Sequence, residues 1–274
     1  MSRSENLPVL PQAVSAILKL ADDPNASQRD LEKAFEKDPA ITAKILRVAN
    51  SAYYGGNQVP SIGRAISMLG ITTIRSLVVG VAFQQVVSSK NSSRLFNKLD
   101  YWTHSLSVAV SSRILGKLKL PSRSEELYCA GMMHDIGYLV LERFMPNELD
   151  KALEDAKKSG GSLVSCEQSV IGFTHAEVGA MLAEKWGLSE VIENAIKFHH
   201  DPSADMNCRE TTEIIATANE LAYQCGYRNQ GYGPDALSDK LKEAIGIPDE
   251  QIAIILQVLD QEIRKAQDSF QIAA

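Results

Sequence analysis

Apolar residues recur along most of the chain at intervals of three and four positions. After Pro11, for example, Val14, Ile17 and Leu18 form one stripe, and a similar stripe follows Pro39. This spacing places side chains on one face of an α-helix, whereas a half-buried strand would alternate at every second position. The pattern therefore predicts an all-α protein.

Start and stop signals divide the stripes into separate helices. We expect helices to begin at Ser27 with Asp30, at Asp38-Pro39 and at Ser61, and at capping boxes spanning 122–125 and 174–177. Gly70 is the expected end of the helix that begins at Ser61. Residues 71–88 could form a strand or a buried helix, and their length and helical neighbours favour a helix.

A polar run at residues 88–93 is the best candidate for a boundary between two lobes. It divides the chain into an N-terminal helical lobe, residues 1–92, and a second lobe, residues 93–274, which ends in a C-terminal helical extension. Gly137 is expected to interrupt the helix that carries His134 and Asp135.

Composition narrows the possible settings. The 274 residues are 45% hydrophobic and 23% charged, as in ordinary globular proteins, and the net charge of −6 argues against a nucleic-acid or acidic-membrane surface. No apolar run approaches the roughly 20 residues of a membrane span, and the first residues lack the apolar core of a signal peptide. The four cysteines are widely spaced. We therefore expect a cytoplasmic protein with reduced thiols.

The five histidines occupy one part of the chain, with none before His104 or after His200. They are His104, His134, His175, His199 and His200. Helical spacing places each on a face shared with apolar residues; His134, for example, lies seven positions after Leu127. A lone inward histidine is usually a hydrogen-bonded core residue, and His199 and His200 could instead complement a helix dipole. Four helices that each direct imidazole inward favour convergence on one site.

Asp135 directly follows His134 and would supply a carboxylate to such a site. Two divalent cations bridged by this carboxylate could bind a phosphate and activate a water molecule for phosphoester hydrolysis. Imidazole and carboxylate ligands suit Mn, Fe, Zn or Ni, and we expect one or two such ions. A hydrolase also benefits from a cation near the leaving group, but the residue that follows the His-Asp turn is the uncharged Tyr138.

These residues resemble a known family. His104 followed by His134-Asp135 is similar to the HD superfamily of metal-dependent phosphohydrolases. Motifs of the first lobe resemble the HDOD domain, the HD-related output domain of bacterial signalling proteins: Leu7-Pro8-x-x-Pro11, Asp38–Leu46, Ala49-Asn50-Ser51 and Ala65-Ile66-x-x-Leu69-Gly70. The resemblance covers roughly residues 7–225. It implies a two-lobed helical domain with the N-terminal lobe packed on an HD-like core, a bacterial cytosolic setting and a role in signal transduction.

The related HD-GYP phosphodiesterases of cyclic di-nucleotides suggest the ligands. The residues that match the order of their metal ligands are His104, His134, Asp135, His175, His199 and His200. Asp100 matches an extra acidic ligand, although it could equally be a helix N-cap. The final ligand, an aspartate in the superfamily, corresponds best to Asn219. The Gly-Tyr-Pro loop after the histidine pair is replaced by Asp201-Pro202, and residues 231–234 are expected to be a surface loop.

Three functional interpretations follow. The first is a regulatory signalling module that binds a protein partner, and possible nucleotide or phosphate ligands, through a metal-binding core without efficient hydrolysis. The second is an active metal-dependent phosphohydrolase acting on a nucleotide or cyclic di-nucleotide, with Asp135 in the catalytic centre. The third is a structural scaffold with an empty site. Asn219 and Tyr138 weaken the case for catalysis, and we favour the first.

Overall fold

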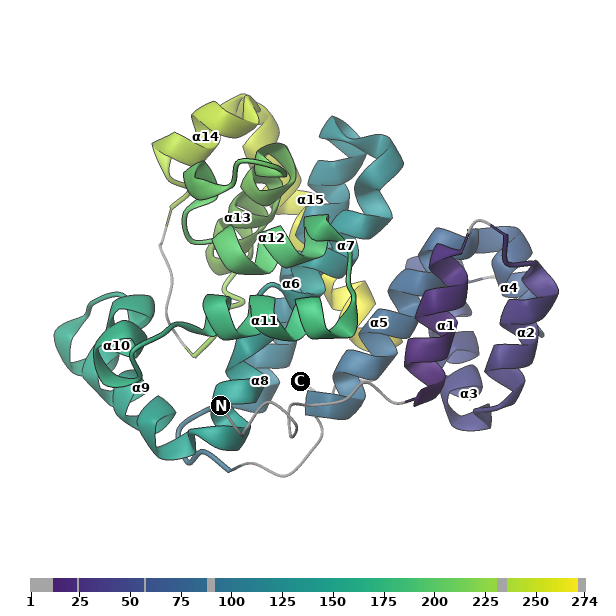
Figure 1. The fold of residues 1–274 in the computed structure, drawn as a ribbon. Coiled ribbons are helices and arrows are strands. Elements are labelled where there is room, and N and C mark those ends of the chain that lie inside the picture. The colour runs from purple at the N-terminus through teal and green to yellow at the C-terminus, as the bar shows by residue number, and fades with distance from the viewer. Residues whose placement is uncertain (1–11, 24, 57, 88–91, 231–235, 271–274) are drawn as a thin grey trace. The chain divides into compact units, whose positions relative to one another are not determined.

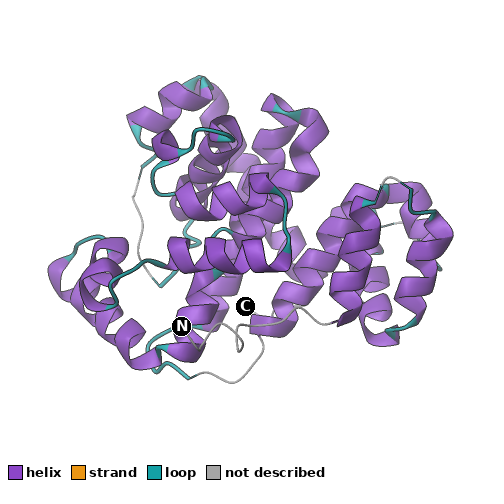
Figure 2. Cartoon of the chain, viewed as in Figure 1, coloured by secondary structure: helices purple, strands orange, loops and turns teal. Residues whose placement is uncertain are grey.

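The computed structural model describes residues 12–23, 25–56, 58–87, 92–230 and 236–270. Throughout these ranges the chain forms helices joined by loops, and they contain no strand (Figure 2). The all-α prediction is confirmed. The motif at residues 7–11, most of the expected boundary at 88–93 and the loop at 231–234 lie outside the described residues.

Two compact units make up the chain. One combines Leu10–Val86 with Val258–Ala274, and the other combines Met1–Val9 with Val87–Gln257. The sequence pattern assigned everything after residue 92 to one lobe, whereas the structure groups the chain from Val258 onward with the N-terminal helices. Hydrogen bonds at the end of the last helix account for this difference. Ser269 Oγ donates to Ser51 Oγ at 2.8 Å, and Gln84 Nε2 donates to the Phe270 carbonyl oxygen at 3.0 Å.

The N-terminal unit is built from short helices whose ends match the expected signals. Its helices are α1 (Gln12–Asp22), α2 (Gln28–Glu36), α3 (Pro39–Ala49), η2 (Ala52–Tyr54), α4 (Ile62–Leu69) and α5 (Ile71–Val87) (Figure 1). Ser27 and Asp30 form a reciprocal capping box, and the Asp38 carboxylate accepts hydrogen bonds from two backbone N–H groups of α3. Residues 71–87 are helical, as their length predicted. Side-chain caps thus satisfy the otherwise unpaired N–H groups at these helix starts.

No single helix in the described ranges has both the length and the apolar composition to cross a membrane. Helices α4 and α5 meet that test only as a pair, and a bend of 119° separates them.

The second unit contains the remaining helices. They are α6 (Lys98–Lys119), η3 (Pro121–Arg123), α7 (Ser124–Met133), α8 (Gly137–Phe144), α9 (Pro146–Ser159), α10 (Leu163–Val170), α11 (His175–Trp186), α12 (Glu190–Phe198), η4 (Pro202–Ala204), α13 (Arg209–Gln224), α14 (Asp239–Ile245) and the first part of α15 (Asp249–Ser269).

Helix α6 is the centre of the second unit. It is buried on nearly all sides and packs mainly against α7 and α13. Two serines fit this apolar setting because their hydroxyl groups donate to backbone carbonyl oxygens one turn earlier in the helix. Ser107 Oγ donates to the Thr103 carbonyl oxygen at 2.7 Å, and Ser111 Oγ donates to the Ser107 carbonyl oxygen at 2.8 Å. His104 is therefore held in the interior of the unit.

The start of α7 corrects one expectation. Ser122 lies within the 3-10 turn η3, and α7 begins at Ser124, with Arg123 at the N-cap and no side-chain cap. Pro121 explains the difference, because its fixed φ angle and missing N–H group suit the first position of the preceding turn. The capping box at 174–177, by contrast, is confirmed: Thr174 and Glu177 cap α11 reciprocally.

Gly137 allows α8 and α11 to meet backbone to backbone. A Cβ atom at this position would overlap the carbonyl group of His175 and lie 3.0 Å from the Gly179 nitrogen. We expect Gly137→Ala to lower the free energy of unfolding by about 3 kcal/mol, because backbone cannot move aside as a side chain can. Gly161→Ala is the matched control in urea unfolding, since its nearest neighbour is the Ser159 hydroxyl, and it should change stability by about 0.5 kcal/mol or less. Equal effects would contradict this interpretation.

Candidate metal centre

Four separate helices bring the histidines of the second unit to one place. His104 lies on α6, His134 and Asp135 lie in the turn between α7 and α8, His175 is the first residue of α11, and the pair His199 and His200 follows α12. Their ligand atoms form two groups, each with all atoms within 4.8 Å of one another. We call Asp135, His175, His199 and His200 the four-residue group, and His104, His134 and Asp135 the three-residue group.

Asp135 belongs to both groups because each of its oxygens faces a different one. Oδ1 lies 3.1 Å from His175 Nε2 and 3.4 Å from His199 Nε2. Oδ2 lies 3.4 Å from His134 Nε2 and 3.7 Å from His104 Nε2. The carboxylate thus has the placement of a bridge between two adjacent sites.

In four of the five histidines, the other ring nitrogen is held by an acceptor, which for His175 is the Glu167 carboxylate. His104 Nδ1 donates to the Tyr227 carbonyl oxygen at 2.9 Å, and His134 and His199 donate to the carbonyl oxygens of Gly131 and Ile196 at 2.8 Å. Carbonyl oxygens can only accept, so these Nδ1 atoms carry the proton. In the neutral ring, the Nε2 lone pair is then directed into the cluster, which is the arrangement found in metal-ligating histidines.

The spacing of these atoms also suits a metal ion. His200 and His175 have Nε2 atoms 3.0 Å apart, and those of His175 and His199 are 3.4 Å apart. Ligands about 2.1 Å from one ion, at angles between 90° and the tetrahedral value, are separated by about 3.0–3.4 Å. The residues present therefore fit a divalent transition metal, which would replace protons between the facing nitrogens.

Charges in the cluster support the same view. Burial and the His134 imidazole lower the pKa of His104 to about 4. Burial also disfavours a charged His175, but the Glu167 and Asp135 carboxylates outweigh it and raise the pKa of His175 to about 10. The pKa of Asp135 is held well below its usual range, because the surrounding imidazoles outweigh the effect of burial. A buried anion among imidazoles favours a cation, whether a proton or a metal ion.

Sequence reasoning missed Glu167, which is fully buried on α10. Its carboxylate accepts from His175 Nδ1 at 2.8 Å and from the His175 backbone N–H at 2.8 Å. The Tyr138 ring stacks on His175 with centroids 4.0 Å apart, and burial together with the nearby Glu167 and Asp135 carboxylates holds the pKa of the Tyr138 hydroxyl group well above its usual value. Tyr138 therefore orients His175 rather than supplying a cation. One signal could have indicated Glu167, since it lies one helical turn after the apolar Leu163.

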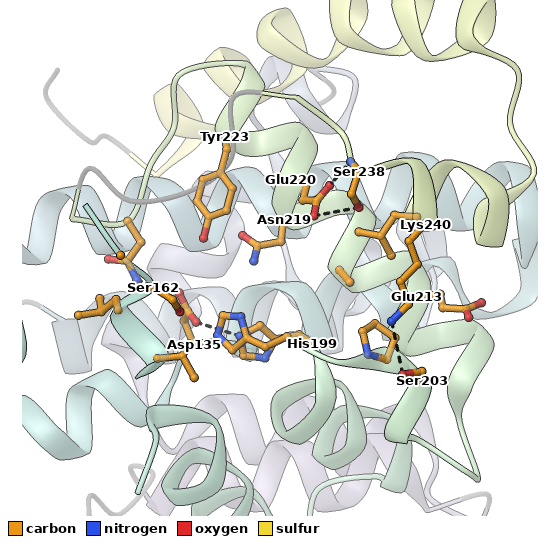
Figure 3. Close-up of a pocket in the computed structure, with 18 of the residues that line it drawn as sticks. Asp135, Ser162, His199, Ser203, Glu213, Asn219, Glu220, Tyr223, Ser238 and Lys240 are labelled. Atoms are coloured by element: carbon orange, nitrogen blue, oxygen red, sulfur yellow. Dashed lines mark hydrogen bonds and ion pairs between the residues drawn. The ribbon is translucent and has the colours of Figure 1, made fainter. Parts of the chain in front are cut away.

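Asn219 and Asp100, the two remaining candidate ligands, lie in different surroundings. Asn219 projects from α13 toward the cavity above Asp135 and His199, beside Tyr223 (Figure 3). None of the described residues donates a hydrogen bond to its buried Oδ1 atom. Asp100 is exposed in the first turn of α6, outside both groups, and the N-cap of that helix is Asn97. The structure thus brings Asn219 to the cavity beside the cluster and leaves Asp100 apart from it.

A pocket of about 1190 Å³ opens beside the cluster. Asp135 and His199 contribute to its wall (Figure 3), and so does His200. Tyr223 also lines the pocket, and its ring stacks on His104 with centroids 5.0 Å apart. Basic side chains also line the pocket: Lys157, Arg209 and Lys240. Acidic side chains line it as well: Glu213, Glu220 and Glu243. The cluster is therefore accessible from a cavity large enough for a ligand of nucleotide size.

An all-helical unit with a buried His/Asp cluster beside a pocket defines an HD-like module. The HDOD domain family matches residues 7–202, and the chain belongs to this family. A crystal structure of an HDOD domain protein with unknown function from Geobacter sulfurreducens has a TM-score of 0.83 at 23% identity, covering 97% of this chain and 94% of that one. A candidate phosphohydrolase from Shewanella amazonensis SB2B has a TM-score of 0.79 at 24% identity, covering 98% and 96%.

A longer protein is also similar in sequence. An uncharacterized protein of Treponema pallidum (strain Nichols) is 26% identical over 224 residues, which cover 79% of this chain. The match spans 42% of that protein's own length.

Proposed function

We propose that this chain is a regulatory HDOD module that holds divalent transition metal ions in its His/Asp cluster and presents them to a phosphate-bearing ligand. The observation that carries the proposal is the geometry of the imidazoles. In His104, His134, His175 and His199 the Nδ1 atoms are occupied by acceptors, and the Nε2 atoms converge around the two oxygens of Asp135. Such an arrangement supports metal binding better than a role in core packing alone.

The ligand atoms of the cluster indicate which metal ions, and how many, it could bind. Each group offers imidazole nitrogens and one carboxylate oxygen, which suits Fe, Mn, Zn or Ni. The four-residue group supplies enough ligands for one ion by itself, whereas the three-residue group leaves positions for water or a ligand atom. We therefore propose two ions, with the more complete set of protein ligands around the first.

The pocket supports a ligand that carries phosphate. Lys157, Arg209 and Lys240 lie along its wall, and Arg209 and Lys240 are each paired with an acidic residue. Metal ions at the cluster would bind phosphate oxygens directly, and these basic groups would add to the attraction. Transmission of the bound state to a protein partner in the cytoplasm is the signalling role that we propose.

Metal analysis tests this proposal. Protein purified without a histidine tag and without chelators is expected to contain about one to two divalent transition metal ions per chain, by mass spectrometry of the elements. Removal of the metal by a chelator should lower the unfolding temperature, because binding stabilises the folded state. A protein that holds no metal as purified, and none after incubation with Fe, Mn, Zn or Ni, would exclude the proposal.

An active phosphohydrolase is the second candidate, favoured by the opening of the cluster onto a cavity with basic groups. Asn219 argues against it, because its amide supplies no negative charge where the superfamily has an aspartate. Incubation of the Mn-loaded and Fe-loaded protein with bis(p-nitrophenyl) phosphate and with cyclic di-nucleotides separates the two. We expect no turnover above background, and turnover that is abolished in His134→Ala would establish the enzyme instead.

A further inference from the structure

The segment Tyr227–Gln230, which follows α13, contacts the cluster at two points. The Tyr227 carbonyl oxygen accepts from His104 Nδ1 at 2.9 Å. The buried Asn229 side chain donates through Nδ2 to Asp135 Oδ2 at 2.7 Å. We call this segment the clasp.

Gln230 anchors the clasp to the start of α6. Its Oε1 atom accepts from the Asn97 backbone N–H at 2.8 Å, and its Nε2 atom donates to the Asn97 carbonyl oxygen at 2.9 Å. The same Nε2 group donates to Asn229 Oδ1 at 3.0 Å. Gln230 also has a φ of 55°, which is uncommon for a residue other than glycine. Both ends of the Gln230 amide are thus hydrogen-bonded, and the residue adopts an unusual backbone conformation.

These contacts determine the orientation of the Asn229 amide. Because Gln230 donates to the Asn229 oxygen, the Asn229 NH₂ group must be the end that faces Asp135. A hydrogen bond of 2.7 Å from this group to a buried carboxylate is short and charge-assisted. Rotation of the Asp135 carboxylate would break that bond, so Asn229 fixes the plane of the carboxylate.

The clasp contacts the side of the cluster that belongs to the three-residue group. Asn229 contacts Oδ2, the oxygen that faces His104 and His134, and the Tyr227 carbonyl orients His104. The histidines of the four-residue group are oriented by other elements, since Glu167 holds His175 and the Ile196 carbonyl holds His199. The clasp therefore reaches the four-residue group only through Asp135, which the two groups share.

We infer that Asn229 is a positioning residue for the metal ion of the three-residue group, and that its loss weakens the second ion much more than the first, to which Asp135 contributes through Oδ1. The inference rests on the proposed function, because it requires the cluster to bind metal. Asn229 takes one acceptor position of Oδ2, and the oxygen keeps a second one on the side of the cluster that holds His104 and His134. Loss of such an outer partner weakens metal binding by about 10–100-fold.

Titration of metal-free protein with Co(II), followed by visible absorption and calorimetry, tests the inference. The wild-type chain is expected to bind two equivalents. In Asn229→Ala the first equivalent should keep its affinity within about 3-fold, whereas the second should weaken by about 10–100-fold and change its absorption band. Gln230→Ala should show the same selective loss to a smaller extent.

Asn207→Ala is the matched control. The exposed Asn207 also donates from its amide to a carboxylate, Glu190, at 2.8 Å, but it does not contact the cluster. Its titration should equal that of the wild type. Circular dichroism and the unfolding temperature establish that each variant is folded. If Asn229→Ala does not fold, the cobalt titration of Gln230→Ala tests the inference in its place.

The possible outcomes separate the two proposals. Wild-type protein that binds no cobalt overturns the proposed function and this inference together. Wild-type protein that binds two ions, with both unchanged or both equally weakened in Asn229→Ala, overturns the inference and leaves the proposed function standing. A single equivalent in the wild type also overturns the inference. Selective loss of the second ion supports both.

Discussion

Asp135→Asn is expected to abolish the binding of both metal ions that we propose for the cluster. The two groups of ligands share this one carboxylate, and each of its oxygens faces different histidines. The amide keeps the shape of the side chain but removes the charge and leaves only one acceptor oxygen. We expect the affinity of each ion to fall by about 100-fold or more, beyond the effect of losing an outer partner. Elemental analysis and calorimetric titration measure this loss.

Asp205→Asn provides the matched control for Asp135→Asn. Asp205 is also a buried aspartate, and its carboxylate accepts hydrogen bonds from Thr212 Oγ1 at 2.6 Å and from the Cys208 backbone N–H at 2.8 Å. It contacts none of the cluster histidines through these bonds. The variant should lose stability but keep its metal. Retention of one tightly bound ion in Asp135→Asn would show that the carboxylate is not a bridge.

Glu167→Ala is expected to have the largest effect on stability. It removes the acceptor for both the ring and the backbone N–H of His175, in a position with no exposure to solvent. Breaking a buried charged pair by deleting one partner costs about 3–5 kcal/mol. We expect a loss of this size in the unfolding free energy of the metal-free protein, measured with urea. Metal in the four-residue group should also bind about 10–100-fold more weakly.

Two variants calibrate the Glu167→Ala result. Glu154→Ala deletes an exposed pair with Lys158 and should cost about 0–1 kcal/mol. Glu167→Gln keeps an acceptor oxygen and should retain part of the stability. Since we propose that Glu167 supports the first ion and Asn229 the second, the two alanine variants should affect different steps of one titration. A Glu167→Ala protein with normal stability and normal metal binding would show that this carboxylate does not position His175.

The helices of this protein could be predicted from local signals. Spacing of apolar residues identified the elements, and the helix starts at Ser27, Asp38 and Thr174 followed from residues within one turn of the chain. The wrong prediction of a helix start at Ser122 also has a local cause. Pro121 lies directly before Ser122 and begins the 3-10 turn η3, which contains Ser122. Helix formation depends largely on neighbours in sequence, so these predictions needed no tertiary information.

The histidines of the cluster could also be identified as candidate ligands from the sequence, because the spacing of apolar residues predicted that they face inward. Four of the five are buried, and His200 is exposed. Their partners could not be identified in this way. Asn229 lies 94 positions from Asp135, and the Tyr227 carbonyl lies 123 positions from His104. A hydrogen bond between such distant positions produces no periodic pattern in the sequence. A backbone carbonyl is present in every residue, so the residue type does not indicate which carbonyl accepts the bond.

By itself, then, the sequence determined the helical class, the helix starts at Ser27, Asp38, Ser61 and Thr174, and the histidines and Asp135 as the groups of a candidate site. Only the tertiary structure decided which nitrogen of each ring points into the cluster, which oxygen of Asp135 faces which histidines, and that Glu167 and Asn229 support opposite sides of the site. The physical reason is the range of the interactions. Helix propensity and amphipathic spacing act within a few residues, whereas the orientation of a ligand depends on acceptors and donors that packing alone brings into contact.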